Sequence, residues 1–253
     1  MNRGAEAGEI AIAARPAGIL RALWGCAGTI LSVLYTIVLA PVAALVAFID
    51  HGHLTGHVCR LWARLILLTC GVHAEIEGLE NLDGLENYVL VSNHQSLFDI
   101  LAVIRLLPLN IRFVAKKELA KIPLIGFTMR KAHHIVIDRR GGGQAIRRAL
   151  EVVRYGYSIC VFAEGTRHSD NRVHEFNDGA AWLAIATHLP CVPMAISGTA
   201  ALMPRGAKLV VPGCRIRIRL GKPIEPCGLR SAGRAELTRQ LEERVRELFT
   251  PAL

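Results

Sequence analysis

One apolar segment near the N-terminus limits most strongly what this chain can fold into. Residues Ala22–Ile49 form a run of 28 residues without a formal charge. As one helix the run would be about 42 Å long, more than the ~30 Å hydrocarbon core of a bilayer requires. Pro41 interrupts the run, and a proline inside a helix removes a hydrogen bond and kinks or breaks the helix. Two structures are therefore open: one tilted span from Ala22 to about Ala40, or a helical hairpin that turns near Pro41 and enters one leaflet.

The segment that follows has the composition of an interfacial helix. His51–Leu68 mixes apolar residues with Arg60 and Arg64, which predicts an amphipathic helix that lies in the membrane interface. His53 and His57 have the i,i+4 spacing of a metal-binding pair, but the sequence offers no full ligand set near them. We therefore expect these histidines on the polar face of the helix and no metal site.

Composition excludes several classes of protein. Hydrophobic residues make up 52% of the 253 residues, too many for a disordered chain. Lys and Arg outnumber Asp and Glu by 30 to 21, a formal net charge of +9, which favours contact with an anionic membrane surface. No nucleic-acid partner is expected, because the aromatic fraction is 6% and no nucleic-acid-binding motif is present. The seven cysteines contain no C-x-x-C pair, which is typical of buried thiols in a reducing compartment.

After Gly71 short β-rich runs alternate with helical runs. The alternation predicts an α/β fold with a mostly parallel or mixed sheet covered by helices, preceded by the N-terminal membrane-associated helical hairpin. The expected strands are Tyr88–Ser92, Ile111–Ala115, Ile135–Ile137, Ile159–Ala163, Val192–Ile196 and Arg215–Leu220. The expected helices are Ile100–Leu107, Gln144–Tyr155, Gly179–Thr187 and Ala235–Phe249.

The last expected strand has one cationic and one apolar face. In Arg215–Leu220 arginines alternate with Ile and Leu. This pattern favours an edge strand that its charges protect from aggregation. The alternative is a cationic face that contacts anionic headgroups or a carrier protein.

Polar residues follow the first expected strand. Asn93, His94, Ser96 and Asp99 come directly after Tyr88–Ser92, and sites in α/β sheets form at strand ends. His94 and Asp99 are five residues apart, a rotation of about 140° on a helix, so a turn would have to bring them together. Asp99 would then accept the Nδ1 proton of His94 and leave Nε2 free as a base. Taken alone, the spacing favours a capping aspartate and a structural histidine.

A second polar segment follows Ile159–Ala163. Gly165 permits close approach of the backbone to a ligand, Thr166 offers a hydroxyl, and Arg167 is a fork-shaped phosphate donor. Glu164 is suited to position Arg167 or to accept a substrate hydroxyl. The alternative is an ordinary strand-to-loop turn with a surface ion pair.

Two further segments place cations just beyond a strand. Lys116 and Lys117 follow Ile111–Ala115, and Arg139 follows Ile135–Ile137. Both are positions where an anion could be bound.

These segments, in this order and spacing, resemble the motifs of the 1-acyl-glycerol-3-phosphate acyltransferase (lysophosphatidic acid acyltransferase) family. The resemblance extends from about Tyr88 to Pro223. The family's N-H-x-S-x-x-x-D motif is matched by Asn93, His94, Ser96 and Asp99, and its E-G-T-R motif by Glu164, Gly165, Thr166 and Arg167. The K-K-E-L and I-D-R segments match residues 116–119 and 137–139, and a V-P-x-x-I-x-G segment matches residues 192–198.

The resemblance implies an acyltransferase. A fatty acyl group would move from acyl-CoA or acyl-carrier protein to the sn-2 hydroxyl of lysophosphatidic acid, giving phosphatidic acid. His94 would act as the general base and Asp99 would orient it. No cofactor, metal ion or Ser or Cys nucleophile is implied. The implied substrate-binding residues are Asn93, Ser96, Lys116, Arg139, Glu164, Gly165, Thr166 and Arg167.

The apolar run, the change of pattern after Gly71 and the resemblance together set domain limits and a location. We expect a flexible N-terminus over residues 1–18, a membrane-associated helical segment over 19–70 and the acyltransferase catalytic domain over 71–253. Because acceptor and product reside in the bilayer, we expect a membrane-associated protein. Its catalytic domain is expected on the cytoplasmic side, at the inner or plasma membrane if the protein is bacterial.

Some positions depart from the family's pattern. Ala163 stands where a proline is usual, His168 where a serine is usual, and Phe176–Gly179 lacks the lysine often found there. These departures leave open the same chemistry on another lyso-lipid, such as a lysophospholipid or an amino-acid-headgroup lyso-lipid. A thioester hydrolase and a non-enzymatic membrane adaptor are the alternatives from other classes.

Overall fold

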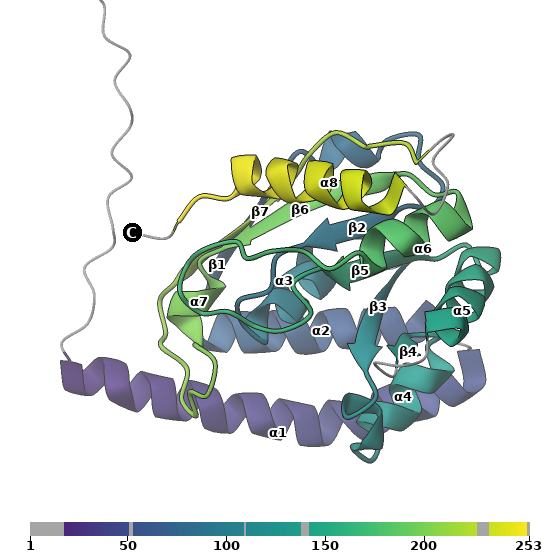
Figure 1. The fold of residues 1–253 in the computed structure, drawn as a ribbon. Coiled ribbons are helices and arrows are strands. Elements are labelled where there is room, and N and C mark those ends of the chain that lie inside the picture. The colour runs from purple at the N-terminus through teal and green to yellow at the C-terminus, as the bar shows by residue number, and fades with distance from the viewer. Residues whose placement is uncertain (1–17, 51–52, 109, 138–141, 227–232, 252–253) are drawn as a thin grey trace, which may run out of the picture.

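A seven-stranded sheet with helices on both faces forms the body of the protein (Figure 1). The computed structural model describes residues 18–50, 53–108, 110–137, 142–226 and 233–251. The strands are β1 (His73–Glu77), β2 (Val89–Ser92), β3 (Ile111–Lys116), β4 (Ile135–Ile137), β5 (Ser158–Phe162), β6 (Cys191–Ser197) and β7 (Arg215–Leu220). The helices are α1 (Gly18–Asp50), α2 (His53–Thr69), η1 (Leu79–Leu82), α3 (Phe98–Leu106), η2 (Leu119–Lys121), α4 (Ile125–Lys131), α5 (Gly142–Arg154), α6 (Gly179–Thr187), α7 (Thr199–Leu202) and α8 (Arg234–Leu248).

The predicted fold class is confirmed: the sheet is mixed and mostly parallel. The strand order is β1-β7-β6-β2-β5-β3-β4, and among these neighbours only β6 and β7 run antiparallel. Each of the six expected strands is present, with small shifts at the ends. The sheet therefore brings the carboxyl ends of β6, β2, β5 and β3 to one edge, where polar segments follow the strands.

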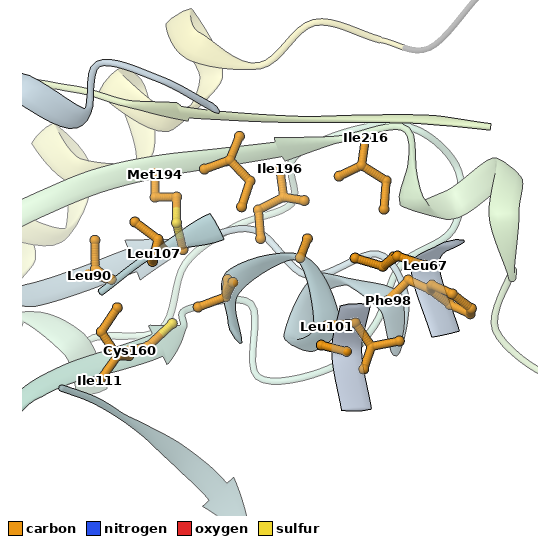
Figure 2. Close-up of a cluster of buried hydrophobic side chains, with 14 of the residues drawn as sticks. Leu67, Leu90, Phe98, Leu101, Leu107, Ile111, Cys160, Met194, Ile196 and Ile216 are labelled. Carbon is orange, nitrogen blue, oxygen red and sulfur yellow. The ribbon is translucent and has the colours of Figure 1, made fainter. Parts of the chain in front are cut away.

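Two hydrophobic clusters lie on opposite faces of the sheet. On one face Leu90, Cys160 and Met194 from the strands pack against Phe98 and Leu101 of α3, and α2 adds Leu67 at the same cluster (Figure 2). On the other face α5, α6 and α8 cover the strands. Every residue of β2 and β6 is buried, as expected for nearly continuous apolar strands that are covered on both faces.

The N-terminal helices form a hairpin, but its turn is not where the sequence predicted it. Helix α1 continues through Pro41 to Asp50, and α2 then runs back along it. Trp62 Nε1 donates to Thr36 Oγ1 at 3.0 Å, and Trp24 Nε1 donates to the Thr69 carbonyl at 2.8 Å. These contacts pair early residues of α1 with late residues of α2, so the two helices are antiparallel.

The expected turn near Pro41 is wrong because packing holds the helix together beyond the proline. A proline inside a helix costs about 3 kcal/mol or more. Immediately after it, Ala43, Ala44 and Ala47 are buried, and their small side chains let α1 approach its neighbours closely. The packing of α1 against α2 and α4 supports the helix where one backbone hydrogen bond is missing.

The outer face of α1 carries apolar side chains that the described residues leave uncovered. By length and composition, Gly18–Ile49 is apolar and long enough to cross a membrane, and only 17% of its most apolar window is buried. The exposed large side chains include Ile19, Leu20, Leu23, Ile30, Val33, Leu34, Ile37, Val38, Leu45, Phe48 and Ile49. This surface suits contact with lipid. The flexible N-terminus was expected over residues 1–18; residues 1–17 lie outside the described residues, and Gly18 begins α1.

Strand β7 is an inner strand, not the edge strand that the sequence favoured. It lies between β6 and β1, a strand that the sequence analysis did not predict. Arg217 and Arg219 of β7 face Glu75 and Glu77 of β1, with a distance of 2.8 Å between Arg219 Nε and Glu77 Oε2. Neighbouring carboxylates thus pair with two of the three arginines of β7.

Candidate active site

The loop between β2 and α3 brings His94 and Asp99 together. β2 ends at Ser92, and Asp99 lies in the first turn of α3. Asp99 Oδ2 accepts the backbone N–H groups of Gln95 at 2.7 Å and Ser96 at 2.9 Å, which closes the loop back on the carboxylate. The turn that the five-residue spacing required is therefore built by the aspartate itself.

His94 and Asp99 are directly hydrogen-bonded. The distance from His94 Nδ1 to Asp99 Oδ2 is 2.7 Å. The Asp99 side chain is fully buried, whereas that of His94 is 14% exposed. Because a carboxylate accepts the bond, Nδ1 carries the proton and Nε2 is the basic nitrogen. The pair has the geometry of a general base with its orienting acid.

Thr199 is a further partner of the aspartate that the sequence analysis missed. Its Oγ1 donates to Asp99 Oδ1, and the residue is fully buried. It lies two residues after the end of β6, the strand next to β2 in the sheet. The rule that sites form at the carboxyl ends of parallel strands would have pointed to it.

A stacking partner fixes the plane of the histidine ring. The His94 ring lies 4.1 Å from that of Phe162, the last residue of β5, with an angle of 13° between the two planes. The backbone N–H of His168 also donates to the His94 carbonyl at 2.9 Å. The ring and the main chain of His94 are thus both held before any substrate is bound.

Asn93 and Ser96 bind the protein's own backbone. Asn93 Nδ2 donates to the Ile196 carbonyl, and Asn93 Oδ1 accepts the Ile196 N–H, each at 2.9 Å. Ser96 Oγ donates to the Met203 carbonyl at 2.8 Å. Both side chains are buried. We therefore expect these two residues to hold the loop in place rather than to contact substrate.

The segment Glu164–Arg167 lies beside His94. The Ala163 N–H donates to the Ser92 carbonyl at 2.9 Å, so the chain after β5 still runs alongside the chain after β2. Gly165 has φ +68°, in the left-handed region, and an added Cβ would lie 3.0 Å from Asn177 Nδ2. A glycine therefore avoids both backbone strain and a close side-chain contact at this sharp turn.

Glu164 is a buried carboxyl group next to the base. Burial raises its pKa to about 7, against the lowering effect of the His174 and His94 backbone amides. Its Oε1 accepts the His174 N–H at 3.4 Å, whereas its buried Oε2 has no hydrogen-bond partner within the described residues. A bound hydroxyl group would satisfy this oxygen.

The predicted phosphate-binding residues are only partly brought together. Arg167 is half-buried and lies in the loop that flanks His94. Lys116 is exposed at the end of β3, whose pairing with β5 stops at Phe113 before residues 114–116 pair with β4. Neither cation has an ion-pair partner within the described residues. Arg139 lies outside those residues.

No metal centre is formed by the part of the chain that the structure describes. It contains no group of three or more His, Cys, Asp or Glu side chains arranged to hold a metal ion.

The sequence and the fold both match known proteins. Residues 73–197 match the family model described as Acyltransferase. A 1-acyl-sn-glycerol-3-phosphate acyltransferase from Saccharomyces cerevisiae is 31% identical over 215 residues, which cover 81% of this chain and 67% of the yeast protein. One from Limnanthes alba is 38% identical over 152 residues, 58% of this chain and 52% of that protein. A chloroplastic one from Brassica napus is 33% identical over 171 residues, 66% of this chain and 49% of that protein.

A solved structure shares the whole architecture. The crystal structure of the 1-acyl-sn-glycerophosphate (LPA) acyltransferase PlsC from Thermotoga maritima superposes with a TM-score of 0.75 at 26% sequence identity. The match covers 90% of this chain and 96% of that one. The chain spans about half the length of the plant relatives it matches.

Proposed function

The chain belongs to the acyltransferase family that includes the 1-acyl-sn-glycerol-3-phosphate acyltransferases, and from that premise we propose that it acylates lysophosphatidic acid. A fatty acyl group moves from a thioester donor to the sn-2 hydroxyl, and the product is phosphatidic acid. The proposal is supported mainly by the hydrogen bond of 2.7 Å between His94 Nδ1 and Oδ2 of the buried Asp99, next to the Glu164–Arg167 loop.

In the proposed reaction His94 Nε2 removes the proton from the acceptor hydroxyl. The hydroxyl oxygen attacks the thioester carbonyl carbon, the carbon–sulfur bond breaks, and the proton passes to the leaving thiolate. Asp99 keeps the Nδ1 proton in place and stabilises the imidazolium that forms in between. The stack on Phe162 keeps the ring plane fixed through both proton transfers.

The transfer is proposed to be direct, without an acyl-enzyme. The hydroxyl groups closest in sequence to His94, on Ser92 and Ser96, are both buried, and they donate to Asn93 Oδ1 and to the Met203 carbonyl. The thiol of Cys160 is also buried, and burial raises its pKa far above neutrality, so it is not a thiolate. None of these groups is suited to act as the nucleophile.

We propose that Arg167 and Lys116 hold the phosphate of the acceptor. A guanidinium group binds phosphate through two parallel hydrogen bonds, and a lysine adds a point charge. Arg139 is proposed as a third cation, as the resemblance implies. Glu164 Oε2 is proposed to accept a hydrogen bond from the glycerol part of the acceptor, because this buried oxygen has no partner within the described residues.

The location of the substrate explains the N-terminal hairpin. Lysophosphatidic acid and phosphatidic acid have acyl chains in the bilayer, so the site must face the membrane surface. We propose that the exposed apolar face of α1 enters the lipid. The net charge of +9 attracts the chain to an anionic, cytoplasmic membrane surface.

The test is acceptor-dependent release of thiol by the purified, detergent-solubilised protein. Acyl-CoA or acyl-carrier protein is supplied with lysophosphatidic acid, and in parallel with lysophospholipids that carry other headgroups. Release that requires lysophosphatidic acid supports the proposal. Thiol release only with a lysophospholipid that carries another headgroup would show the same reaction on a different acceptor lipid. Release without any acceptor contradicts the proposal and identifies a thioester hydrolase.

A further inference from the structure

The outer edge of the sheet has a cavity that the proposed mechanism does not use. It lies along β4, between the η2–α4 segment and α5, and has a volume of about 470 Å³. Four cationic side chains line it: Lys117, Lys121, Arg130 and Arg148. Cavities of a few hundred Å³ are typical of sites for small molecules.

The lining gives the cavity an excess of positive charge. Glu151 is its one carboxylate among the lining residues, and it pairs with Arg148 at 2.8 Å. Arg130 Nη1 donates to the Ala120 carbonyl at 3.0 Å, which holds its guanidinium group at the wall. Burial lowers the pKa of His134 to about 3, so this ring adds no charge. The cavity therefore suits a ligand with several negative charges.

We propose that this cavity binds the 3′-phosphorylated ADP part of coenzyme A, and that it is the nucleotide site of the acyl donor. The inference rests on the proposed acyltransferase function. Three phosphate groups on one small molecule match a cluster of lysines and arginines at close quarters. A carrier protein carries its phosphopantetheine on a folded domain that is far too large for a cavity of about 470 Å³. The cavity therefore favours the CoA thioester as donor.

The cavity lies within reach of the base. The His134 ring at the cavity wall lies 5.8 Å from the Phe113 ring, and its Nδ1 accepts the Phe113 N–H at 3.0 Å. Phe113 lies 6.2 Å from Phe162, which stacks on His94 at 4.1 Å. Three ring-to-ring steps thus separate the cavity wall from His94. In CoA, the long pantetheine arm separates the nucleotide from the thioester by a comparable gap.

The two lysines that follow one another at the end of β3 are then assigned to different ligands. Lys117 lines the cavity, whereas Lys116 does not. We assign Lys117 to the donor's phosphates and Lys116 to the acceptor's phosphate.

The test uses a pair of double variants of the full-length protein. Lys121→Glu/Arg148→Glu reverses two charges that line the cavity. Arg147→Glu/Arg154→Glu reverses two exposed charges on α5 that do not line it. Both change the net charge equally, and circular dichroism with thermal melting checks that both variants fold. Calorimetry measures binding of CoA and of adenosine 3′,5′-bisphosphate, and kinetics compare acyl-CoA with acyl-pantetheine, which lacks the nucleotide.

The cavity variant is expected to bind CoA at least about tenfold more weakly and to raise KM for acyl-CoA by a similar factor. KM for lysophosphatidic acid and turnover of acyl-pantetheine are expected to be unchanged, and the control variant is expected to match wild type. Equal CoA affinities in the two variants would overturn the inference, as would a wild-type protein that binds neither CoA nor the bisphosphate. A wild type that binds CoA through the cavity but transfers no acyl group would refute the proposed function and leave the cavity as a CoA site.

Discussion

At Asp99 a single buried carboxylate accepts hydrogen bonds from the His94 ring, the Gln95 and Ser96 amides and Thr199 Oγ1. The two amides form the loop, and the threonine holds the second oxygen. Only the bond to the ring bears on chemistry, since it decides which ring nitrogen carries the proton. The aspartate thus links the local fold of residues 94–99 to the state of the proposed base.

We predict that Asp99→Asn lowers kcat about a thousandfold. An asparagine would keep its carbonyl oxygen toward the Gln95 and Ser96 amides and the Nδ1 proton, so the substitution removes the negative charge that stabilises the imidazolium. KM should change little, because the substitution removes no proposed substrate contact. Steady-state kinetics measure both constants, and Asp83→Asn, an exposed aspartate in the same half of the chain, serves as the control. A variant with nearly unchanged kcat would exclude this role for Asp99.

We predict that the free energy of unfolding depends on pH through the carboxyl group of Glu164. Its carboxyl group has a pKa near 7 in the folded protein, because it is buried, and near 4.5 in the unfolded chain. The folded state therefore holds the proton more tightly, and this stabilisation is complete below the unfolded pKa and is lost as the pH rises through 7. Relative to Glu164→Gln, wild type should lose about 2 kcal/mol of unfolding free energy between pH 5 and 8.

Urea unfolding of both proteins at a series of pH values measures this difference. The glutamine stays neutral, so the other titrating groups cancel in the comparison. A difference between the two proteins that is independent of pH would show that Glu164 is ionised at neutral pH.

At the scale of elements, the loop after β5 depends on its glycine. We predict that Gly165→Ala lowers stability by about 1 kcal/mol or more and activity at least tenfold, because φ is +68° and the new Cβ would approach Asn177 Nδ2. Gly84→Ala is a matched control: φ is +76°, but nothing lies within 4 Å of its Cβ. Thermal melting of both variants measures the cost of backbone strain, which they share. Kinetics measure the effect of displacing Glu164 and Arg167, which is expected only in Gly165→Ala. Full activity in Gly165→Ala would show that activity does not depend on the turn at Gly165.

The sequence predicted those elements whose pattern is local. β2 and β5 are apolar runs followed by polar motifs, so both the strands and the residues at their ends, His94 and Glu164, could be found in advance. β1 could not, because His-Ala-Glu-Ile-Glu has two carboxylates in five residues and is supported by arginines of β7 far along the chain. Thr199 and Phe162, which contact Asp99 and His94, lie far from them along the chain and were not predicted as their partners, although the rule that sites form at the ends of parallel strands would have pointed to Thr199.

At the scale of the whole molecule, we propose that α1 places the site relative to the membrane. Ile30 and Ile37 lie on the exposed face of this helix. We predict that Ile30→Asp/Ile37→Asp reduces flotation with anionic vesicles at least tenfold, because each buried charge in lipid costs about 2–3 kcal/mol. Leu150→Asp/Tyr155→Asp, at exposed positions in α5 and directly after it, is the control and should float as wild type does.

The Ile30→Asp/Ile37→Asp variant should turn over soluble short-chain substrates at the wild-type rate. The helix contributes location and not chemistry, so only activity on acceptors embedded in vesicles is expected to fall. If the variant still floats fully with the vesicles, α1 is not the membrane-binding element.

Acyl transfer by His94→Ala tests whether His94 is the base that activates the acceptor. His73→Ala removes an exposed histidine of β1 and is the matched control. With both proteins shown to be folded, we predict that His94→Ala keeps less than about a thousandth of wild-type turnover with lysophosphatidic acid, while the control is unchanged. Acceptor-dependent turnover by His94→Ala within about tenfold of wild type would show that His94 is not the general base.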